Sequence, residues 1–505
     1  MKKVPILFIV MLAMCQATII HAEEVKLTAG DAAADDNFST SVAISGNYAI
    51  VGAPGNDDDG DRSGSAYIFV LDGGVWAQQA KLTAKDGAGG DFFGRSVSID
   101  GDWAIVSSHH DDIWSGSAYI YQRDGKNWKE HGKLDPDDGE ANDSFAFSVD
   151  ISGDTAIKGA DSGSVFVYVR VKDKWVEEQK FTPRDAEGGD IFGSAVSIDG
   201  DYAIIGALWD DDKGNRSGSA YIYKRVRNVW QQEAKLTASD GARNAEFGFS
   251  VHISGKYAIV GAYGHNSGTG AAYVFVRNED KWKEEAKLTA SDGQPKDDFG
   301  ISVSINGTTG NIGALVGSYR HDGKGSNSGA VYSFLRKGNA WVERAKLTGS
   351  DVEAADRFGV SVSLSANHGI TGSSLKNGGT GAAYIYNAFD LALPVEPLGK
   401  QVVLWGQIRR NALYQNFPNP FNPETWIPYQ LAEDAFVTLT ISDLTGYVVR
   451  TFNVGHQPAA MYTSKERAIY WDGRNDTGEP VSSGIYFYHL QAGDFATTKK
   501  MIIIK

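Results

Sequence analysis

The chain has 505 residues, with 48 Lys and Arg against 63 Asp and Glu, giving a formal net charge of −15. This acidic balance, without a basic cluster, excludes binding of nucleic acid through its phosphates. The length predicts more than one domain, and the 59 Gly and 12 Trp residues favour a chain of tight turns and aromatic strands.

Residues 1–22 have the pattern of a secretory signal peptide. Two lysines precede an apolar run that ends near Ala22, before two glutamates. The run is too short to span a membrane, so we expect no transmembrane segment in the mature chain. A lipoprotein signal cleaved before Cys15 is the alternative, and Met14 disfavours it. Cys15 is the sole cysteine, so the mature chain would carry no disulfide and no thiol chemistry.

A unit of 47 to 59 residues then recurs seven times. Each copy begins with a Lys-Leu-Thr-like element, and a Phe that is usually followed by Gly comes 12 residues after the lysine. The pairs are Lys26 and Phe38, Lys81 and Phe93, Lys133 and Phe145, Lys180 and Phe192, Lys235 and Phe247, Lys287 and Phe299, and Lys346 and Phe358. This fixed spacing predicts one structural unit per copy.

Each copy predicts four short strands. In the second copy, residues 93–99 alternate small polar and apolar side chains, and a Gly turn leads to residues 103–106. A loop of variable length precedes residues 117–121, and a fourth strand opens with Trp128. The apolar second and third strands need cover on both faces, which radial stacking of sheets provides. We therefore predict an all-β fold with a seven-bladed β-propeller over residues 23–389.

The two ends of the repeat region predict how the ring closes. The last copy has a third strand at residues 382–386 but no fourth strand, whereas residues 24–28 form an isolated fourth strand at the start. Pairing them would remove two open sheet edges. We predict that residues 24–28 pair with the strand that ends at Tyr386.

The repeated elements resemble a known family. Phe93-Gly94 and Gly52-Ala53-Pro54 resemble the FG-GAP repeat of integrin-alpha-type propellers, and the KLTASDG, SVSI and SGSAYIF elements are most similar to its bacterial extracellular subfamily. We expect a secreted or cell-surface adhesion or ligand-binding protein that is not an enzyme, with an extracellular protein or glycan as partner. A secreted hydrolase or lyase that acts on polysaccharide through the acidic propeller face is the alternative.

After the repeats, residues 390–412 predict a linker and residues 413–505 a small immunoglobulin-like β-sandwich. Its predicted strands are residues 425–431, 436–441, 447–450, 468–471, 484–490 and 499–505. This domain resembles the type A C-terminal sorting domain of type IX secretion substrates and, more distantly, the immunoglobulin-like domain of flagellar hook-capping proteins. The elements that carry the resemblance begin at Asn416, Trp471, Ser483 and Lys500. It implies export through secretion machinery. An accessory sandwich is the alternative.

Two acidic positions recur in the repeats. The first lies five residues after each lysine: Asp31, Asp86, Asp138, Asp185, Asp240, Asp292 and Asp351. The second lies two residues before the Phe: Asp36, Asp91, Asp143, Asp190, Asp297 and Asp356, with Glu246 displaced by one residue. We interpret both as turn caps, and a ring of carboxylates for Ca²⁺ or cationic ligands is the alternative.

Two of the variable loops are acidic. Their candidate ligand-binding residues are Asp57, Asp58, Asp59, Asp61, Asp210, Asp211 and Asp212. Asp57, Asp59 and Asp61 are also candidate metal ligands, with Ca²⁺ as the ion, although they do not match the EF-hand pattern. The calcium loops of integrin-type repeats are expected between the first and second strands, where this chain has only a tight turn such as Ser45-Gly46. Solvated acidic loops are the alternative.

One loop is rich in histidine. His109, His110, Asp111 and Asp112 are candidate ligand-binding residues, with exposed loop polarity as the alternative. We predict no catalytic residue. The Trp at the start of most fourth strands indicates packing of the outer strands: Trp76, Trp128, Trp175, Trp230, Trp282 and Trp341.

Strand order predicts where a ligand would bind. In a four-stranded blade, the connections from fourth to first strand and from second to third strand emerge on the same rim. Rigid scaffolds present functional residues on such loops. We therefore expect ligand contacts at residues 57–61, 109–114, 210–215 or 319–327.

Overall fold

The computed structural model describes residues 24–111, 116–135, 145–160, 163–185, 189–279, 281–307, 312–387, 411–414, 416–417, 419, 421, 423–431, 434–457, 461–462 and 468–504. They form two compact units, residues 24–387 and residues 411–504, and each is described by itself. The predicted signal peptide and most of the predicted linker lie outside these residues. No helix among them is both long enough and apolar enough to cross a bilayer.

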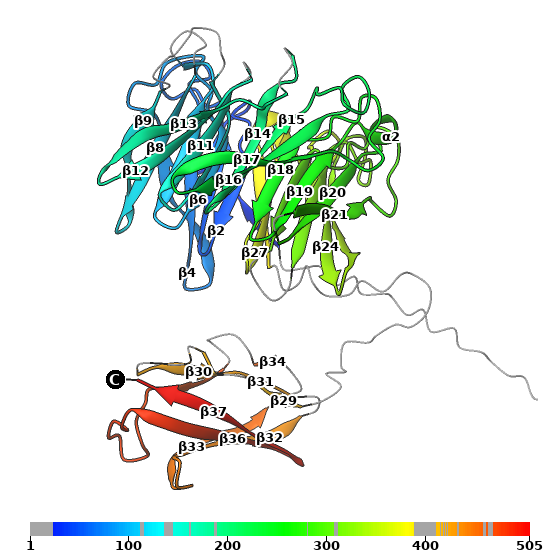
Figure 1. Ribbon diagram of the computed structural model, residues 1–505. Coiled ribbons are helices and arrows are strands. Elements are labelled where there is room, and N and C mark those ends of the chain that lie inside the picture. Colours follow the sequence, from blue (N-terminus) through cyan, green and yellow to red (C-terminus); the bar gives the residue numbers. More distant parts are fainter. Residues whose placement is uncertain are drawn as a thin grey trace, which may run out of the picture. The chain divides into compact units, whose positions relative to one another are not determined.

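The first unit is a β-propeller of seven four-stranded antiparallel sheets (Figure 1). Six blades follow the chain in order. Blade 1 is β2 (Val42–Ser45), β3 (Tyr48–Ala53), β4 (Ser65–Asp72) and β5 (Val75–Leu82); blade 2 is β6 (Phe93–Asp100), β7 (Trp103–Ser108), β8 (Ser117–Asp124) and β9 (Asn127–Leu134). Blade 3 is β10 (Phe145–Ser152), β11 (Thr155–Ala160), β12 (Val165–Val171) and β13 (Lys174–Phe181); blade 4 is β14 (Phe192–Asp199), β15 (Tyr202–Ala207), β16 (Ser219–Val226) and β17 (Val229–Leu236).

The remaining blades repeat the pattern. Blade 5 is β18 (Ser250–Ser254), β19 (Tyr257–Ala262), β20 (Ala271–Asn278) and β21 (Lys281–Leu288), and blade 6 is β22 (Ser302–Asn306), β23 (Gly313–Ser318), β24 (Ala330–Lys337) and β25 (Ala340–Leu347). Single helical turns α2 (His265–Gly268) and α3 (Lys376–Gly379) lie in connections between second and third strands. The predicted seven-bladed all-β fold is confirmed.

The seventh blade closes the ring with strands from both ends of the repeat region. β26 (Val362–Leu364), β27 (His368–Ser373) and β28 (Ala382–Asn387) are joined by β1 (Glu24–Leu27). β1 and β28 are antiparallel, with Glu24 opposite Tyr386 and Leu27 opposite Ala383. The predicted closure is confirmed.

Two glycines of the repeat are required where neighbouring blades touch. A Cβ on Gly52 would lie 1.9 Å from the backbone oxygen of Gly94 in the next blade, which is an impossible contact. Gly94 itself has a φ of +94°, a conformation that L side chains rarely adopt. The same clash recurs at Gly159, Gly206, Gly261 and Gly317, so the two glycines of the motif make a close contact at most blade boundaries.

The outer strands also bind neighbouring blades together. Trp128 donates its indole N–H to the side-chain oxygen of Gln79 at 2.9 Å, and Trp282 donates to Glu233 at 2.8 Å. Trp341 donates to Glu285 at 2.9 Å. These contacts confirm the predicted packing role of the repeated Trp residues.

The second unit is a β region built from three sheets. A four-stranded sheet contains β33 (Val448–Gln457), β32 (Ala435–Ser442), β36 (Gly484–Ala492) and β37 (Phe495–Ile503). A three-stranded sheet contains β29 (Ala412–Leu413), β31 (Tyr429–Gln430) and β34 (Met461–Tyr462), and a two-stranded sheet pairs β30 (Thr425–Ile427) with β35 (Ile469–Trp471). Their inner faces share a core around the fully buried Trp471.

Several predicted bounds in this unit were wrong: β33 runs on to Gln457 and β37 begins at Phe495, whereas the predicted strands covered residues 447–450 and 499–505. The strand predicted over residues 425–431 is divided at Pro428, because proline has no N–H for a ladder and the two halves pair in different sheets. β29 begins at Ala412, the last residue of the predicted linker, where it pairs with Gln430.

Candidate functional site

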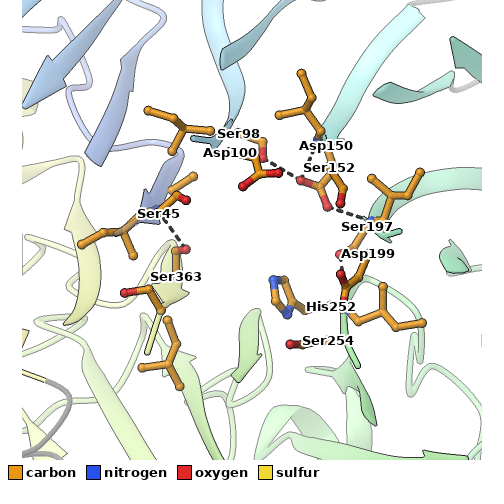
Figure 2. Close-up of a pocket in the computed structure, with 18 of the residues that line it drawn as sticks. Ser45, Ser98, Asp100, Asp150, Ser152, Ser197, Asp199, His252, Ser254 and Ser363 are labelled. Atoms are coloured by element: carbon orange, nitrogen blue, oxygen red, sulfur yellow. Dashed lines mark hydrogen bonds between the residues drawn. The ribbon is translucent and has the colours of Figure 1, made fainter. Parts of the chain in front are cut away.

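The propeller surrounds a central cavity of about 450 Å³. The innermost strand of every blade lines it, and alternation within these strands points every second side chain inward. Figure 2 shows Ser98, Asp150, Ser197, His252 and Ser363 around the cavity. The lining is therefore rich in serine hydroxyls and also contains the Asp150 carboxylate and the His252 imidazole. Asp100 and Asp199 add two further carboxylates.

The cavity-lining side chains replace missing backbone pairing. The innermost strands of neighbouring blades belong to separate sheets, so their N–H groups need other acceptors. Ser197 Oγ accepts from the N–H of Ile253 at 3.3 Å, and Ser363 Oγ accepts from that of Ile44 at 3.2 Å. Asp150 Oδ2 accepts from the N–H of Ile198 at 2.8 Å. These polar groups hold the blades together from inside.

Two ionisable groups of the cavity have perturbed protonation. Burial raises the pKa of Asp150, although Ser98 donates a hydrogen bond to its Oδ1 at 2.6 Å. Burial lowers the pKa of His252, while the charges of Asp150 and Asp199 oppose this shift. His252 Nδ1 accepts from the N–H of Ile305 at 3.3 Å, so the neutral ring carries its proton on Nε2. Sequence reasoning missed this cavity because its lining comes from seven separate copies.

The predicted shared rim is confirmed. In the boundary between blades 1 and 2, the N–H of Gly90 donates to the backbone oxygen of Asp61 at 2.8 Å, and that of Phe92 donates to Arg62 at 3.0 Å. These bonds join a connection between second and third strands to one between fourth and first strands. We call this side of the propeller the loop face, and the side with the tight Gly turns the turn face.

The acidic loop of blade 1 is held by its own aspartates. Asp57 Oδ1 accepts from the N–H of Arg62 at 2.8 Å, and Asp58 forms an ion pair with Lys81. Asp59 and Asp61 have exposed side chains. Among the residues that the structure describes, no three His, Cys, Asp or Glu side chains gather closely enough to hold a metal ion. The candidate ligands Asp57, Asp59 and Asp61 are therefore not brought together.

The loop of blade 4 has the same construction. Asp211 Oδ1 accepts from the N–H of Arg216 at 2.6 Å, and Asp212 pairs with Lys235 at 2.7 Å. Asp210 is buried and also pairs with Lys235, at 2.8 Å. Of the three candidates in this loop, Asp211 and Asp212 remain exposed at the surface.

The histidine loop of blade 2 is packed rather than exposed. His109 lies 5.4 Å from the ring of Phe92, and His110 lies 5.0 Å from it. Burial, with the charges of His110 and Arg95, lowers the pKa of His109 to about 3, so its ring is neutral at pH 7. Asp111 is buried and accepts from the Tyr119 hydroxyl at 2.8 Å. Asp112 lies outside the described residues.

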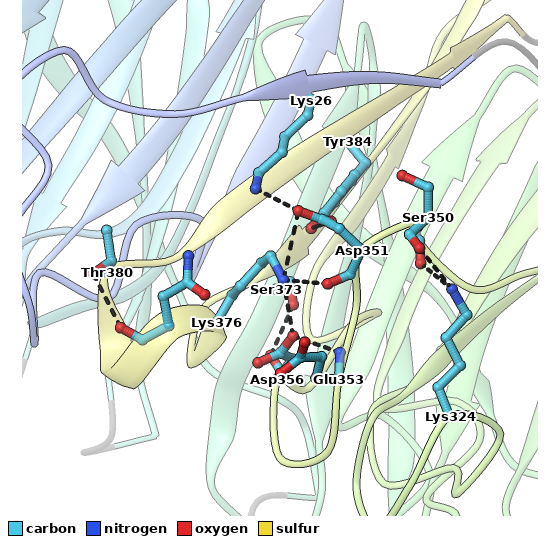
Figure 3. A network of polar contacts seen from close by, with 12 residues as sticks. Lys26, Lys324, Ser350, Asp351, Glu353, Asp356, Ser373, Lys376, Thr380 and Tyr384 are labelled. Carbon is cyan, nitrogen blue, oxygen red and sulfur yellow. Dashed lines mark hydrogen bonds and ion pairs between the residues drawn. The ribbon is translucent and has the colours of Figure 1, made fainter.

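The first set of repeated aspartates does not cap turns as predicted. Each described member pairs with the lysine of the next copy, and Asp86, Asp240, Asp292 and Asp351 also accept a hydrogen bond from a tyrosine of the third strand. In the copy shown in Figure 3, Asp351 pairs with Lys26 at 2.6 Å and accepts from the Tyr384 hydroxyl at 2.7 Å. Asp240 likewise pairs with Lys287 at 2.6 Å. These pairs were not predicted because each lysine lies about one copy away from its aspartate along the chain, and no local pattern reveals such a contact.

The second set does cap turns. Asp36 accepts from the N–H of Ala33 at 2.7 Å, and Asp297 accepts from that of Gln294 at 2.8 Å. Asp356 accepts from the N–H of Glu353 at 2.8 Å (Figure 3). The prediction of turn capping is confirmed for these positions.

The loop face also carries aromatic side chains that the repeat pattern does not single out. Trp209 lies under the guanidinium of Arg216 at 4.2 Å, and Phe92 lies under that of Arg62 at 6.0 Å. Tyr319 lies 5.2 Å from the guanidinium of Arg320. The three have no common position in the repeat: Tyr319 directly follows the Gly-Ala-like pair, Trp209 lies one residue further on, and Phe92 directly precedes the Phe of the Phe-Gly pair.

The comparison with known families agrees with this architecture. The sequence profile described as the FG-GAP repeat matches seven segments of the chain: residues 21–69, 76–121, 128–168, 175–223, 230–275, 282–334 and 341–386. No match was found among curated proteins. Each matched segment overlaps the first three strands of one blade and the fourth strand that precedes them in the chain.

Proposed function

Because the chain belongs to the FG-GAP repeat family, we propose that it is a secreted or cell-surface adhesion protein that binds an extracellular protein or glycan and is not an enzyme. The binding surface is the loop face. The observation that carries this proposal is that a closed, rigid ring gathers nearly all the length variation of its connections on one side.

The chemistry of the loop face supports binding rather than reaction. Its acidic side chains are used repeatedly for ion pairs and caps, as with Asp58 and Lys81 in blade 1 or Asp212 and Lys235 in blade 4. Because equivalent side chains form these contacts in several blades, the loop face carries the same fixed polar contacts more than once. Catalysis instead calls for unlike groups that converge on one bond.

The route to the surface is a further part of the proposal. Residues 1–22 act as a cleaved signal peptide, and residues 413–505 act as a sorting domain of the type IX secretion kind in a bacterial host. The separate β region after the last repeat, with its own buried core, supports an independent export module.

The alternative function, a hydrolase or lyase acting on polysaccharide, is favoured by one observation. The central cavity contains unlike groups, since Asp150, Asp199 and His252 share it. A release of reducing ends from a polysaccharide panel by the purified protein, lost in His252→Gln, would favour this alternative over adhesion.

The test of the proposed function is a screen of glycans and matrix proteins for binding to the full mature chain. The matched variant shortens the connections at residues 57–61, 109–114, 210–215 and 319–327 to the length of the connection between Gly159 and Ser162 in the third copy. The control variant, Asp102→Asn with Asp201→Asn, alters the turn face. Each measurement is made with Ca²⁺ and with EGTA, because Asp57, Asp59 and Asp61 are the candidate ligands.

We expect at least one ligand whose binding is lost in the shortened variant and kept in the control variant. The shortened variant must show an unchanged circular dichroism spectrum and cooperative melting. A ligand that binds the shortened variant as well as the unaltered protein would place the binding surface elsewhere.

A further inference from the structure

Three arginine-aromatic units lie on the loop face, in different parts of the ring. The first is Arg62 over Phe92, with 6.0 Å from the guanidinium carbon to the ring centre, and the second is Arg216 over Trp209, at 4.2 Å. The third is Tyr319, which Arg320 approaches at 5.2 Å and Arg357 at 5.5 Å. All three aromatic rings are half-buried, so each keeps an accessible part.

Three of these four arginines have an uncommon backbone, and one of them is Arg357, with a φ of +58°. Arg62 has a φ of +53° and Arg216 a φ of +55°, at equivalent positions in the loops of blades 1 and 4. The equivalent residue in blade 6 is Asn327, at +53°. Asparagine tolerates this left-handed conformation, whereas arginine gains nothing from it. The same conformation recurs at Phe92, Glu246 and Asp298, so it belongs to the architecture of the repeat, and the guanidinium is what distinguishes Arg62 and Arg216 from Asn327.

Hydrogen bonds within the loops fix the backbone positions of Arg62 and Arg216. The N–H of Arg62 donates to Asp57 Oδ1 at 2.8 Å, and the N–H of Arg216 donates to Asp211 Oδ1 at 2.6 Å. Both side chains are exposed beyond this anchored backbone. The acidic loops therefore serve to hold the arginines in place.

Part of the acidic charge beside the arginines is already paired, since Asp58 forms an ion pair with Lys81 and Asp212 forms one with Lys235. The formal net charge is −15, yet each unit presents at least one guanidinium. His109 and His110, which pack on Phe92, are neutral at pH 7 because burial lowers the pKa of both. In the third unit Arg320 pairs with Asp298 at 3.1 Å, whereas Arg357 forms no ion pair with the side chains that the structure describes. These positive points in an acidic surface are complementary to an anionic ligand.

A stacked guanidinium and an aromatic ring recognise two parts of one kind of molecule. The guanidinium edge donates paired hydrogen bonds to a carboxylate or sulfate. The aromatic ring packs against the apolar face of a sugar. Because the units belong to separate blades, a ligand that reaches more than one of them must be extended.

We propose that the loop face binds an anionic polysaccharide, with its acidic groups on Arg62, Arg216 and Arg357 and its sugar rings on Phe92, Trp209 and Tyr319. This inference rests on the proposed function, which assigns binding to the loop face, and names the class of ligand. The shared chemistry is a carboxylate or sulfate on a sugar chain.

The experiment measures equilibrium binding of the full mature chain to polygalacturonate, dextran sulfate, uncharged dextran and poly-glutamate at low and high salt. The variants are Arg62→Gln, Arg216→Gln and Arg357→Gln, singly and together, and Trp209→Ala. Arg243→Gln is the matched control, because Arg243 is an exposed arginine on the same face, in the connection between β17 and β18.

We expect binding to polygalacturonate, to dextran sulfate or to both, which identifies the acidic group, and none to dextran. Each unit arginine should contribute about tenfold in affinity, Trp209→Ala should also weaken binding, and Arg243→Gln should not. Binding should weaken as salt rises. Absence of binding to both acidic polysaccharides would overturn the inference, as would poly-glutamate binding of equal strength that Trp209→Ala leaves unchanged.

The outcome separates this inference from the proposed function. If a different ligand binds, and loop shortening abolishes its binding while the arginine variants do not, the anionic polysaccharide is wrong and the loop face stands. If no ligand depends on the loops, both proposals fail.

Discussion

At the scale of residues, the repeated aspartates show how position decides the role of one side chain. Asp356 caps a turn, whereas Asp351, five positions earlier, joins the connection between blades 6 and 7 to blade 7 through Lys26 and Tyr384. Burial alone would raise the pKa of Asp351, but the hydrogen bonds from Lys26 and Tyr384 outweigh it and hold the pKa at about 2.

This lowered pKa predicts a pH dependence of stability. An unfolded aspartate titrates near about 3.9, so the contribution of Asp351 is fully present above about pH 4 and is lost as the pH falls toward 2. Asp351→Asn should lower the free energy of unfolding by up to about 1 kcal/mol at pH 7, because the half-exposed pair is screened by solvent. It should have no effect near pH 2.

Urea unfolding of both proteins at several pH values between 2 and 7 tests this prediction. Asp72→Asn, which alters an exposed aspartate, is the control. A difference between Asp351→Asn and the unaltered protein that stays constant down to pH 2 would show that the lost contact is not ionic.

At the scale of elements, β1 differs from every other strand because it lies at the start of the repeat region and completes the last blade. Four residues, Glu24 to Leu27, pair with β28, and Leu27 is buried. Glu24 also accepts from the Tyr386 hydroxyl at 2.6 Å and from the Ser350 hydroxyl at 2.6 Å. One short strand thus joins the two ends of the ring.

Deletion of residues 24–28 should destabilise the whole propeller and not only its seventh blade. The loss of the buried Leu27 side chain alone costs about 2–5 kcal/mol, and the deletion also exposes an edge of β28. Differential scanning calorimetry of the mature chain should show a lower Tm for the propeller transition.

A peptide of residues 23–29 added in excess should restore part of the lost Tm, and the same peptide with Val25→Pro should not, because proline cannot donate to the ladder. An unchanged Tm after the deletion would mean that the pairing contributes nothing to the stability of the ring.

At the scale of the whole molecule, the residues that hold the blades together differ from the residues of the proposed binding surface. Fixed contacts at the blade boundaries, such as Gly52 against Gly94, repeat around the ring. The connections that differ in length and side chain lie on the loop face. The second unit has a separate core around Trp471, so its contribution to stability and the export role proposed for it can be measured apart from the propeller.

Removal of residues 413–505 should leave the propeller folded and prevent its export. The propeller transition should keep its Tm within about 2 °C, because the two units have separate cores. In a host with type IX secretion, the shortened protein should remain inside the cell, as measured by immunoblotting of the medium and surface fractions. Normal surface levels of the shortened protein would contradict the sorting role.

The sequence by itself determined the architecture of the propeller. Fixed spacing between Lys and Phe, alternation in the first strand and apolar second and third strands are local patterns, and they predict blades because a strand reveals its two faces within a few residues. The isolated strand at residues 24–28 also predicted ring closure, since each blade needs four strands. The strands of the second unit were predicted less accurately, because Pro428 divides a strand that the sequence pattern predicted as continuous.

Only the tertiary structure decided what the polar side chains do. Asp351 meets Lys26 across the closed ring, Asp150 meets the N–H of Ile198 in the next blade, and Arg216 lies over Trp209 after a turn of the chain. The partners of the first two lie about one copy or almost the whole ring away along the chain. A repeat pattern fixes where each residue sits within its blade, but the contact depends on the angle and height at which neighbouring blades meet, and that is set by the packing of the entire ring.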